Sequence, residues 1–246
     1  MPSNSIAASL RAGLLPAVNV GRLRRFFKGQ GLAGRTPVFL VLTRELVHMA
    51  PLAVAVRGPG FQPVFVFNGV SLSDKDWLRD MVGDIPDVSL MVSLTGNPLS
   101  VLDHGTVIEY LLDTYRRPFC IQDPDCFVTD RNFFQSVKLD EAGQYAAGPF
   151  TKEISRNCIR IPDTFFLYLN APLFLELQSR YGLRARTTRQ PPARLAGLLE
   201  KGGFPAGTYP GSSKVATTRF RCSGSRQRHW VRVSGSSPAR ARQSFT

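Results

Sequence analysis

The chain has 246 residues, of which 43% are hydrophobic, so it can form one large domain or one domain with terminal extensions. It contains no run of about 18 or more apolar residues, and we therefore predict no transmembrane helix. Its four cysteines are scattered and form no Cys-x-x-Cys pair. This pattern argues against a zinc site or a disulfide framework and fits reduced thiols in a cytoplasmic protein.

The net charge of +13 is unevenly distributed along the chain. Residues 1–36 carry six basic and no acidic side chains, residues 37–183 carry 12 basic and 17 acidic ones, and residues 184–246 carry 13 basic ones and one acidic one. The central part is therefore mildly acidic. The basic charge, which would otherwise indicate a nucleic-acid-binding protein, lies at the two ends.

This distribution divides the chain into three parts. Residues 1–35 form a basic N-terminal extension, for which we favour a frayed, solvated segment over a weak peripheral contact with an anionic membrane surface. Residues 36–183 form the globular domain. Residues 184–246 form a low-complexity basic tail that lacks an apolar period, and we expect it to be disordered. The composition changes abruptly at Leu183, as out-of-frame sequence would produce, and the domain would then be truncated.

Strand and helix patterns alternate within the globular part. Continuous apolar runs predict strands over residues 37–43, 62–67, 87–93 and 119–122, and such runs are typical of a parallel sheet that is buried on both faces. Helical patterns cover residues 46–56, with Pro51 as a kink or late start, residues 73–81, with Ser73 as N-cap, and residues 101–115. Strands over residues 145–150 and 163–170 and a helix over residues 171–181 follow. The predicted fold class is α/β, with a mainly parallel sheet flanked by helices.

Polar residues follow several of these strands, at the sheet edge where α/β proteins bind ligands. Thr43, Arg44 and Glu45 follow the first strand, and Asn68 follows the second. The chain contains neither GxGxxG nor GxxxxGK[ST], which argues against a dinucleotide dehydrogenase and a P-loop NTPase.

Two carboxylates, Asp123 and Asp125, follow the fourth predicted strand. Pro124 lies between them and ends the strand because proline lacks a backbone N–H. Carboxylates one residue apart, between apolar anchors, can converge on a divalent cation that also binds phosphate oxygens. The alternative is an ordinary Asp-Pro turn without a ligand.

The order of these motifs over about residues 36–183 resembles the nucleotide-sugar-binding half of GT-A-fold glycosyltransferases. The shared features are Thr43-Arg44 after the first strand, His104-Gly105 at a helix start, and Asp123-Pro-Asp-Cys-Phe-Val. The last is similar to the Asp-Ser-Asp-Cys-Phe-Val of bacterial, family-2-like members. The resemblance implies a Rossmann-like half in which Asp123 and Asp125 hold Mn²⁺ or Mg²⁺ on the diphosphate, with Asp125 as the direct ligand. It also implies a set of residues that contact the nucleotide sugar, namely Thr43, Arg44, Glu45, Asn68, His104 and Asp123.

The activity implied by the resemblance is transfer of a sugar from a nucleotide-sugar donor to a saccharide or lipid-linked acceptor. An inverting enzyme needs a general base, and Asp163 is a candidate by position only. The donor sugar, the acceptor and the stereochemical course stay open. We expect a cytoplasmic enzyme, with a peripheral membrane location as the alternative.

Two other functions compete with this interpretation. A nucleotidyltransferase-like metal enzyme ranks lower because no Gly-rich, Lys-containing loop follows Leu42. A non-enzymatic nucleic-acid-binding protein that uses the basic termini ranks last, and nucleic acid is not the expected partner.

Overall fold

The computed structural model describes residues 3–30, 32, 34–94, 100–136, 146–148, 151–154, 159–162, 166–181, 207–208 and 215–217. The predicted base Asp163 and most of the basic tail lie outside these residues. Within the described part of the chain, no helix combines the length and apolarity that a membrane span requires.

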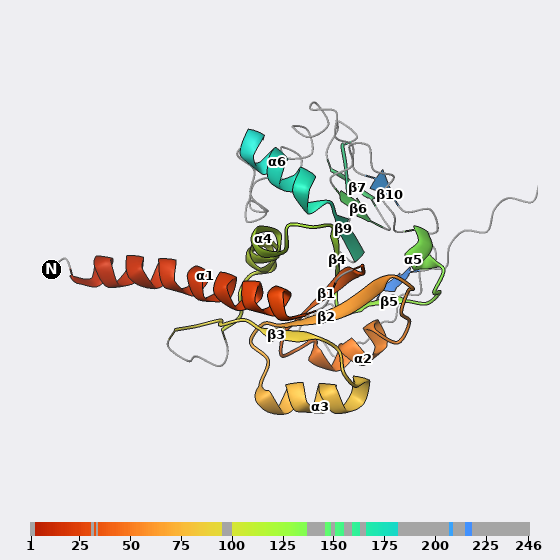
Figure 1. Cartoon of the computed structure of the whole chain (residues 1–246), viewed down its shortest axis with the longest axis horizontal. Coiled ribbons are helices and arrows are strands. Elements are labelled where there is room, and N and C mark those ends of the chain that lie inside the picture. The colour runs from red at the N-terminus through yellow and green to blue at the C-terminus, as the bar shows by residue number, and fades with distance from the viewer. Residues whose placement is uncertain are drawn as a thin grey trace, which may run out of the picture.

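A seven-stranded sheet forms the centre of the fold, in the strand order β10-β6-β9-β4-β1-β2-β3 (Figure 1). Its strands are β1 (Thr36–Leu42), β2 (Phe61–Phe67), β3 (Asp87–Ser89), β4 (Phe119–Gln122), β6 (Ala146–Gly148), β9 (Phe166–Leu169) and β10 (Gly207–Thr208). Strands β3, β2, β1 and β4 are parallel, and β9 runs antiparallel between β4 and β6. The predicted α/β class with a mainly parallel sheet is therefore confirmed.

Helices cover both faces of the sheet (Figure 1). They are α1 (Ser3–Gly29), η1 (Val47–Met49), α2 (Ala50–Ala53), α3 (Leu72–Val82), α4 (His104–Tyr115), α5 (Phe133–Ser136) and α6 (Ala171–Tyr181). Along β1, Val38, Leu40 and Leu42 belong to the core that contains residues of α2 and α3. Phe39 and Val41 belong to the core that contains residues of α1, α4 and α6. Burial on both faces explains why the strand sequences are continuously apolar.

Several element boundaries differ from the sequence-based prediction. The expected helix over residues 46–56 is a short 3₁₀ turn followed by the one-turn helix α2, with Pro51 at its start, where the missing N–H costs little. The N-cap of α3 is Ser71 rather than Ser73, because the Ser71 hydroxyl accepts the backbone N–H of Asp74. Strand β3 ends at Ser89, short of the predicted residue 93.

The N-terminal helix α1 is part of the fold, contrary to the expected frayed extension. Leu23 is fully buried, and Phe27 contacts the rings of Phe39 and Tyr115 at centroid distances of 5.8 and 5.0 Å. The fully buried amide of Asn19 also exchanges two hydrogen bonds with Met91, donating to its carbonyl at 2.9 Å and accepting its N–H at 2.7 Å. Over residues 14–30, apolar burial and these bonds anchor the helix to α4 and to the chain after β3. The prediction of a solvated segment is therefore wrong there.

Two further pairs of short strands lie outside the seven-stranded sheet. Strand β5 (Cys126–Val128) pairs antiparallel with β11 (Val215–Thr217), and β7 (Thr151–Ile154) pairs antiparallel with β8 (Ile159–Pro162). The short strands β10 and β11 lie within the basic tail, for which the sequence predicted no secondary structure.

Candidate functional site

The carboxyl ends of β3, β2, β1 and β4 lie at one edge of the sheet because these strands are parallel. A cavity of about 710 Å³ opens at this edge. Its lining residues come from the segments after β1, β2 and β3 and from the start of α3: Arg44, His48, Phe67, Gly69, Val70, Ser71, Ser73, Asp74, Lys75, Leu90, Val92 and Ser93. The volume lies within the range of pockets that enclose small ligands and cofactors.

Two cationic side chains line the cavity. Arg44 is exposed two residues after the end of β1 and was among the predicted nucleotide-sugar contacts. Lys75, on the first turn of α3, is 9% exposed; its Nζ donates to Ser89 Oγ at 2.9 Å and lies 5.3 Å from the centre of the Phe67 ring. Burial lowers the pKa of Lys75, and the charge of Asp87 partly opposes this shift. The cavity therefore presents two cations to a bound ligand.

Asn68, a predicted ligand contact, is 1% exposed and binds the backbone instead. Its Nδ2 donates to the carbonyl of Leu102 and its Oδ1 accepts the N–H of Leu102, both at 2.8 Å. The next residue, Gly69, has a φ of +79°, and a Cβ there would lie 2.6 Å from the carbonyl oxygen of Ser100. The end of β2 thus holds the segment that leads into α4, and the amide of Asn68 is used for that purpose.

The predicted contact His104 is the first residue of α4 and is exposed. Asp103 caps this helix by accepting the backbone N–H of Thr106 at 3.1 Å, and it also accepts the Thr106 hydroxyl. His104 is not among the residues that line the cavity.

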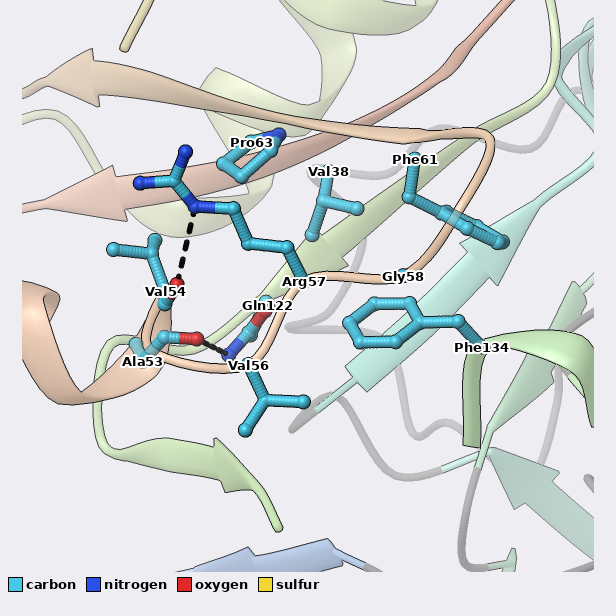
Figure 2. A pocket seen from close by; sticks show the side chains of 10 residues that line it. All are labelled: Val38, Ala53, Val54, Val56, Arg57, Gly58, Phe61, Pro63, Gln122 and Phe134. Carbon is cyan, nitrogen blue, oxygen red and sulfur yellow. Dashed lines mark hydrogen bonds between the residues drawn. The ribbon is translucent and has the colours of Figure 1, made fainter. Parts of the chain in front are cut away.

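The Asp123-Pro124-Asp125 turn follows β4 and is closed by backbone and amide groups. The N–H of Cys126 donates to the carbonyl of Asp123 at 2.9 Å. The buried Nε2 of Gln122 donates to the carbonyls of Cys126 at 2.7 Å and Ala53 at 2.9 Å; Figure 2 shows the bond to Ala53. These bonds hold the backbone of the turn at the end of β4.

A second cavity lies beside Gln122 and has a volume of only about 10 Å³. Figure 2 shows that its lining is mainly apolar and that the Phe61 and Phe134 rings lie beside each other. Their centroids are 5.1 Å apart and their planes are tilted by 48°. This volume is at the lower limit for a cavity that can hold one water molecule. We therefore assign the second cavity no ligand.

The donor set at the turn fits a hard divalent cation that shares its ligands with phosphate. Asp123 and Asp125 are both half-buried, and burial raises the pKa of Asp125 while a hydrogen bond with its own backbone lowers it in part. A cation would offset the cost of partial burial for an ionised carboxylate. Among the described residues, no group of three or more His, Cys, Asp or Glu side chains is placed to hold a metal.

The structure brings the predicted residues to one sheet edge but only Arg44 into the cavity lining. Thr43 and Glu45 flank Arg44 in the chain, and the carbonyl of Thr43 accepts the N–H of Val47 at 2.9 Å where the 3₁₀ turn starts. The sequence analysis missed Lys75 and Phe67 at the cavity and Gln122 at the turn. The signal in the sequence is that Lys75 stands between Asp74 and Asp76 at the start of the predicted helix over residues 73–81, where basic residues are unfavourable.

The chain was compared with curated proteins, solved structures and protein families. No curated protein matches the sequence. Among solved structures, the mannosyltransferase PcManGT from Pyrobaculum calidifontis, in complex with GDP-Man and Mn²⁺, matches with a TM-score of 0.49 and 15% identity, over 88% of this chain and 68% of that one. Glucosyl-3-phosphoglycerate synthase from Mycobacterium tuberculosis matches with a TM-score of 0.45 and 13% identity, over 82% of this chain and 76% of that one.

The WbbM bifunctional glycosyltransferase matches with a TM-score of 0.44 and 10% identity, over 61% of this chain. The matched part spans about a third of the WbbM chain, 34% of its length. The family model of the StrH glycosyltransferase N-terminal domain matches residues 16–174, which begin within α1 and extend into α6. Because this match covers more than half of the 246 residues, the chain belongs to the StrH glycosyltransferase N-terminal domain family.

Proposed function

We propose that the chain binds a nucleotide-sugar donor and transfers its sugar to a saccharide or lipid-linked acceptor, with a divalent metal at Asp123 and Asp125. The observation that carries this proposal is the arrangement at the sheet edge. The cavity with Arg44 and Lys75 lies at the ends of β1, β2 and β3, and the two carboxylates follow the neighbouring strand β4. Family membership supports the same activity.

The residues have separate roles in this proposal. The cavity binds the nucleoside, and the guanidinium of Arg44 pairs with phosphate oxygens, for which its planar array of donors is suited. Asp123 and Asp125 hold Mn²⁺ or Mg²⁺, which supplies positive charge to the diphosphate leaving group. Gln122 keeps the two carboxylates in place by closing the turn that carries them. The general base stays unassigned, since Asp163 lies outside the described residues.

Calorimetry with UDP and GDP, with and without Mn²⁺, tests the proposal. The wild-type protein should bind one of the two nucleotides in a Mn²⁺-dependent manner. Asp125→Asn keeps the size of the side chain but removes its charge, so it should fold normally and lose the Mn²⁺-dependent part of the affinity. Asp113→Asn, at an exposed position on α4, is the matched control and should bind like the wild type.

The outcomes separate the two parts of the proposal. Equal nucleotide affinity with and without Mn²⁺, unchanged by Asp125→Asn, would leave a nucleotide site but remove the metal from it. A wild-type protein that binds neither nucleotide under any condition would contradict the proposed function of this chain.

A further inference from the structure

The lining of the cavity contains one cation that the metal and phosphate chemistry does not require. Lys75 reaches the cavity from α3 and is 9% exposed, whereas Arg44 is exposed at its mouth. A lysine is rarely this buried unless its ammonium group has partners. Lys75 has two of them in the hydroxyl of Ser89 and the face of the Phe67 ring.

The surroundings hold Lys75 in one place. Its partner Ser89 is itself fixed, because the backbone carbonyl of Ser89 accepts a hydrogen bond from Arg22 on α1 at 3.2 Å. Charged groups near the ammonium comprise Asp87, Arg79, Arg22 and Asp76. Of these, Arg79 and Asp87 are paired with each other at 3.1 Å. The ammonium group is therefore preorganised between α3 and β3, and binding a ligand would cost it little side-chain entropy.

The position of Lys75 across the sheet indicates which part of a nucleotide it would meet. Phe67 ends β2 and Ser89 ends β3, whereas the two carboxylates follow β4, with β1 in between. Neighbouring strands lie about 4.8 Å apart, so β2 and β3 lie roughly 10 and 14 Å from β4. This is the separation between the base and the diphosphate in an extended nucleoside diphosphate. A diphosphate held at Asp123 and Asp125 therefore places the base, rather than a phosphate, near Lys75.

We propose that Lys75 reads the base of the bound nucleotide and selects bases that present a carbonyl oxygen, uracil and guanine, over their amino counterparts, cytosine and adenine. This inference rests on the proposed nucleotide-binding function. An ammonium group donates hydrogen bonds and accepts none. It can pair with O4 of uracil or O6 of guanine, whereas the amino group at the same position of cytosine or adenine leaves two donors facing each other.

The test compares nucleotide pairs that differ at this position, UDP with CDP and GDP with ADP, by calorimetry in the presence of Mn²⁺. The relevant pair is the one that contains the nucleotide preferred by the wild type. In that pair, the nucleotide with the carbonyl (UDP or GDP, the carbonyl member) should bind about 10- to 100-fold more tightly than the nucleotide with the amino group (CDP or ADP, the amino member). This factor is expected for one hydrogen bond to a charged group. Lys75→Met keeps the apolar stem but removes the donor. It should reduce this ratio to about threefold or less, mainly by weakening the carbonyl member.

Two further variants complete the design. Lys28→Met removes a lysine at an exposed position on α1 and should keep the wild-type ratio. Ser89→Ala leaves the charge of Lys75 but removes its hydrogen-bond partner, so the ratio should fall part of the way. If Lys75→Met does not fold, the wild-type and Ser89→Ala ratios decide the question.

A wild-type ratio near one would overturn the inference while leaving the proposed function intact. So would a Lys75→Met protein that is folded and binds the carbonyl and amino members equally more weakly, because that result would assign Lys75 to a phosphate or to general packing. Absence of any nucleoside diphosphate binding would instead overturn the proposed function and this inference with it.

Discussion

Asn68 and Leu102 are 34 residues apart in the chain and exchange two hydrogen bonds of 2.8 Å each, between one side-chain amide and one backbone residue. These bonds connect the end of β2 to the segment before α4, so the cavity edge and the α4 start are held together. Asn68 follows the last residue of β2, and its own N–H donates to the carbonyl of Leu42 at the end of β1. One residue therefore connects three segments of the site edge.

Asn68→Ala should lower the free energy of unfolding by about 1–3 kcal/mol, because the N–H and carbonyl of the partly buried Leu102 would lose their partner. Urea unfolding measures this change. Gln30→Ala, at an exposed position at the end of α1, is the control and should stay within about 0.5 kcal/mol of the wild type. Equal stabilities of the two variants would show that the amide contributes little to holding the segment.

Leu23→Ala on α1 should destabilise the protein by about 2–5 kcal/mol, since this side chain is fully buried in the core shared with α4 and β1. The matched control is Leu14→Ala on the same helix, where the side chain is 53% exposed and the change should be within about 0.5 kcal/mol. Thermal and urea unfolding of both variants would measure the difference. A negligible effect of Leu23→Ala would mean that α1 is not packed in solution.

Arg44→Ala should weaken the Mn²⁺-dependent binding of a nucleoside diphosphate by about 1.5–3 kcal/mol, which is the range for hydrogen bonds to charged groups. The comparison is Arg24→Ala, which removes the same charge at an exposed position on α1. Titration at two salt concentrations would distinguish a direct contact from a general electrostatic effect. Equal losses for both variants that disappear at high salt would remove Arg44 from the site.

The stability of the protein should depend on pH through Lys75. Burial lowers its pKa below the model-peptide value of 10.5, so between the lowered value and 10.5 the unfolded chain binds a proton that the folded chain does not. The free energy of unfolding contributed by this group should therefore rise as the pH increases through that window. Urea unfolding from pH 7 to 10.5 should show this rise in the wild type and in Lys28→Met, but not in Lys75→Met. Parallel pH profiles for all three proteins would contradict it.

The sequence predicted the strands correctly where consecutive residues are all buried. The runs at β1, β2 and β4 predicted both the strands and the sheet type, because strands covered on two faces leave no polar positions to obscure the pattern. Arg44 was predicted at the cavity for the related reason that loops after parallel strands converge at one edge.

The parts that the sequence did not predict depend on contacts between distant segments. The amide of Asn19 is buried because Met91, 72 residues away, presents a backbone N–H and carbonyl to it. Asn68 was predicted as a ligand contact because it follows a strand at the edge where ligands bind. Nothing in the local sequence indicates that its amide binds Leu102 instead. Lys75 was not singled out in the sequence, because its burial depends on Phe67 and Ser89. In each case the environment of a polar side chain comes from tertiary structure rather than local pattern.

The bonds between Asn19 and Met91 have a consequence for self-association. Strand β3 is the last strand of the described sheet on its side, and such an edge can pair with a strand of another molecule. Asn19 occupies both backbone groups of Met91, just beyond β3, with the same donor and acceptor arrangement that an added strand would use. These bonds, with the one from Arg22 to the carbonyl of Ser89, place side chains of α1 against the end of this edge. A chain from which α1 has been cut away should therefore aggregate through β3 more readily than the intact chain.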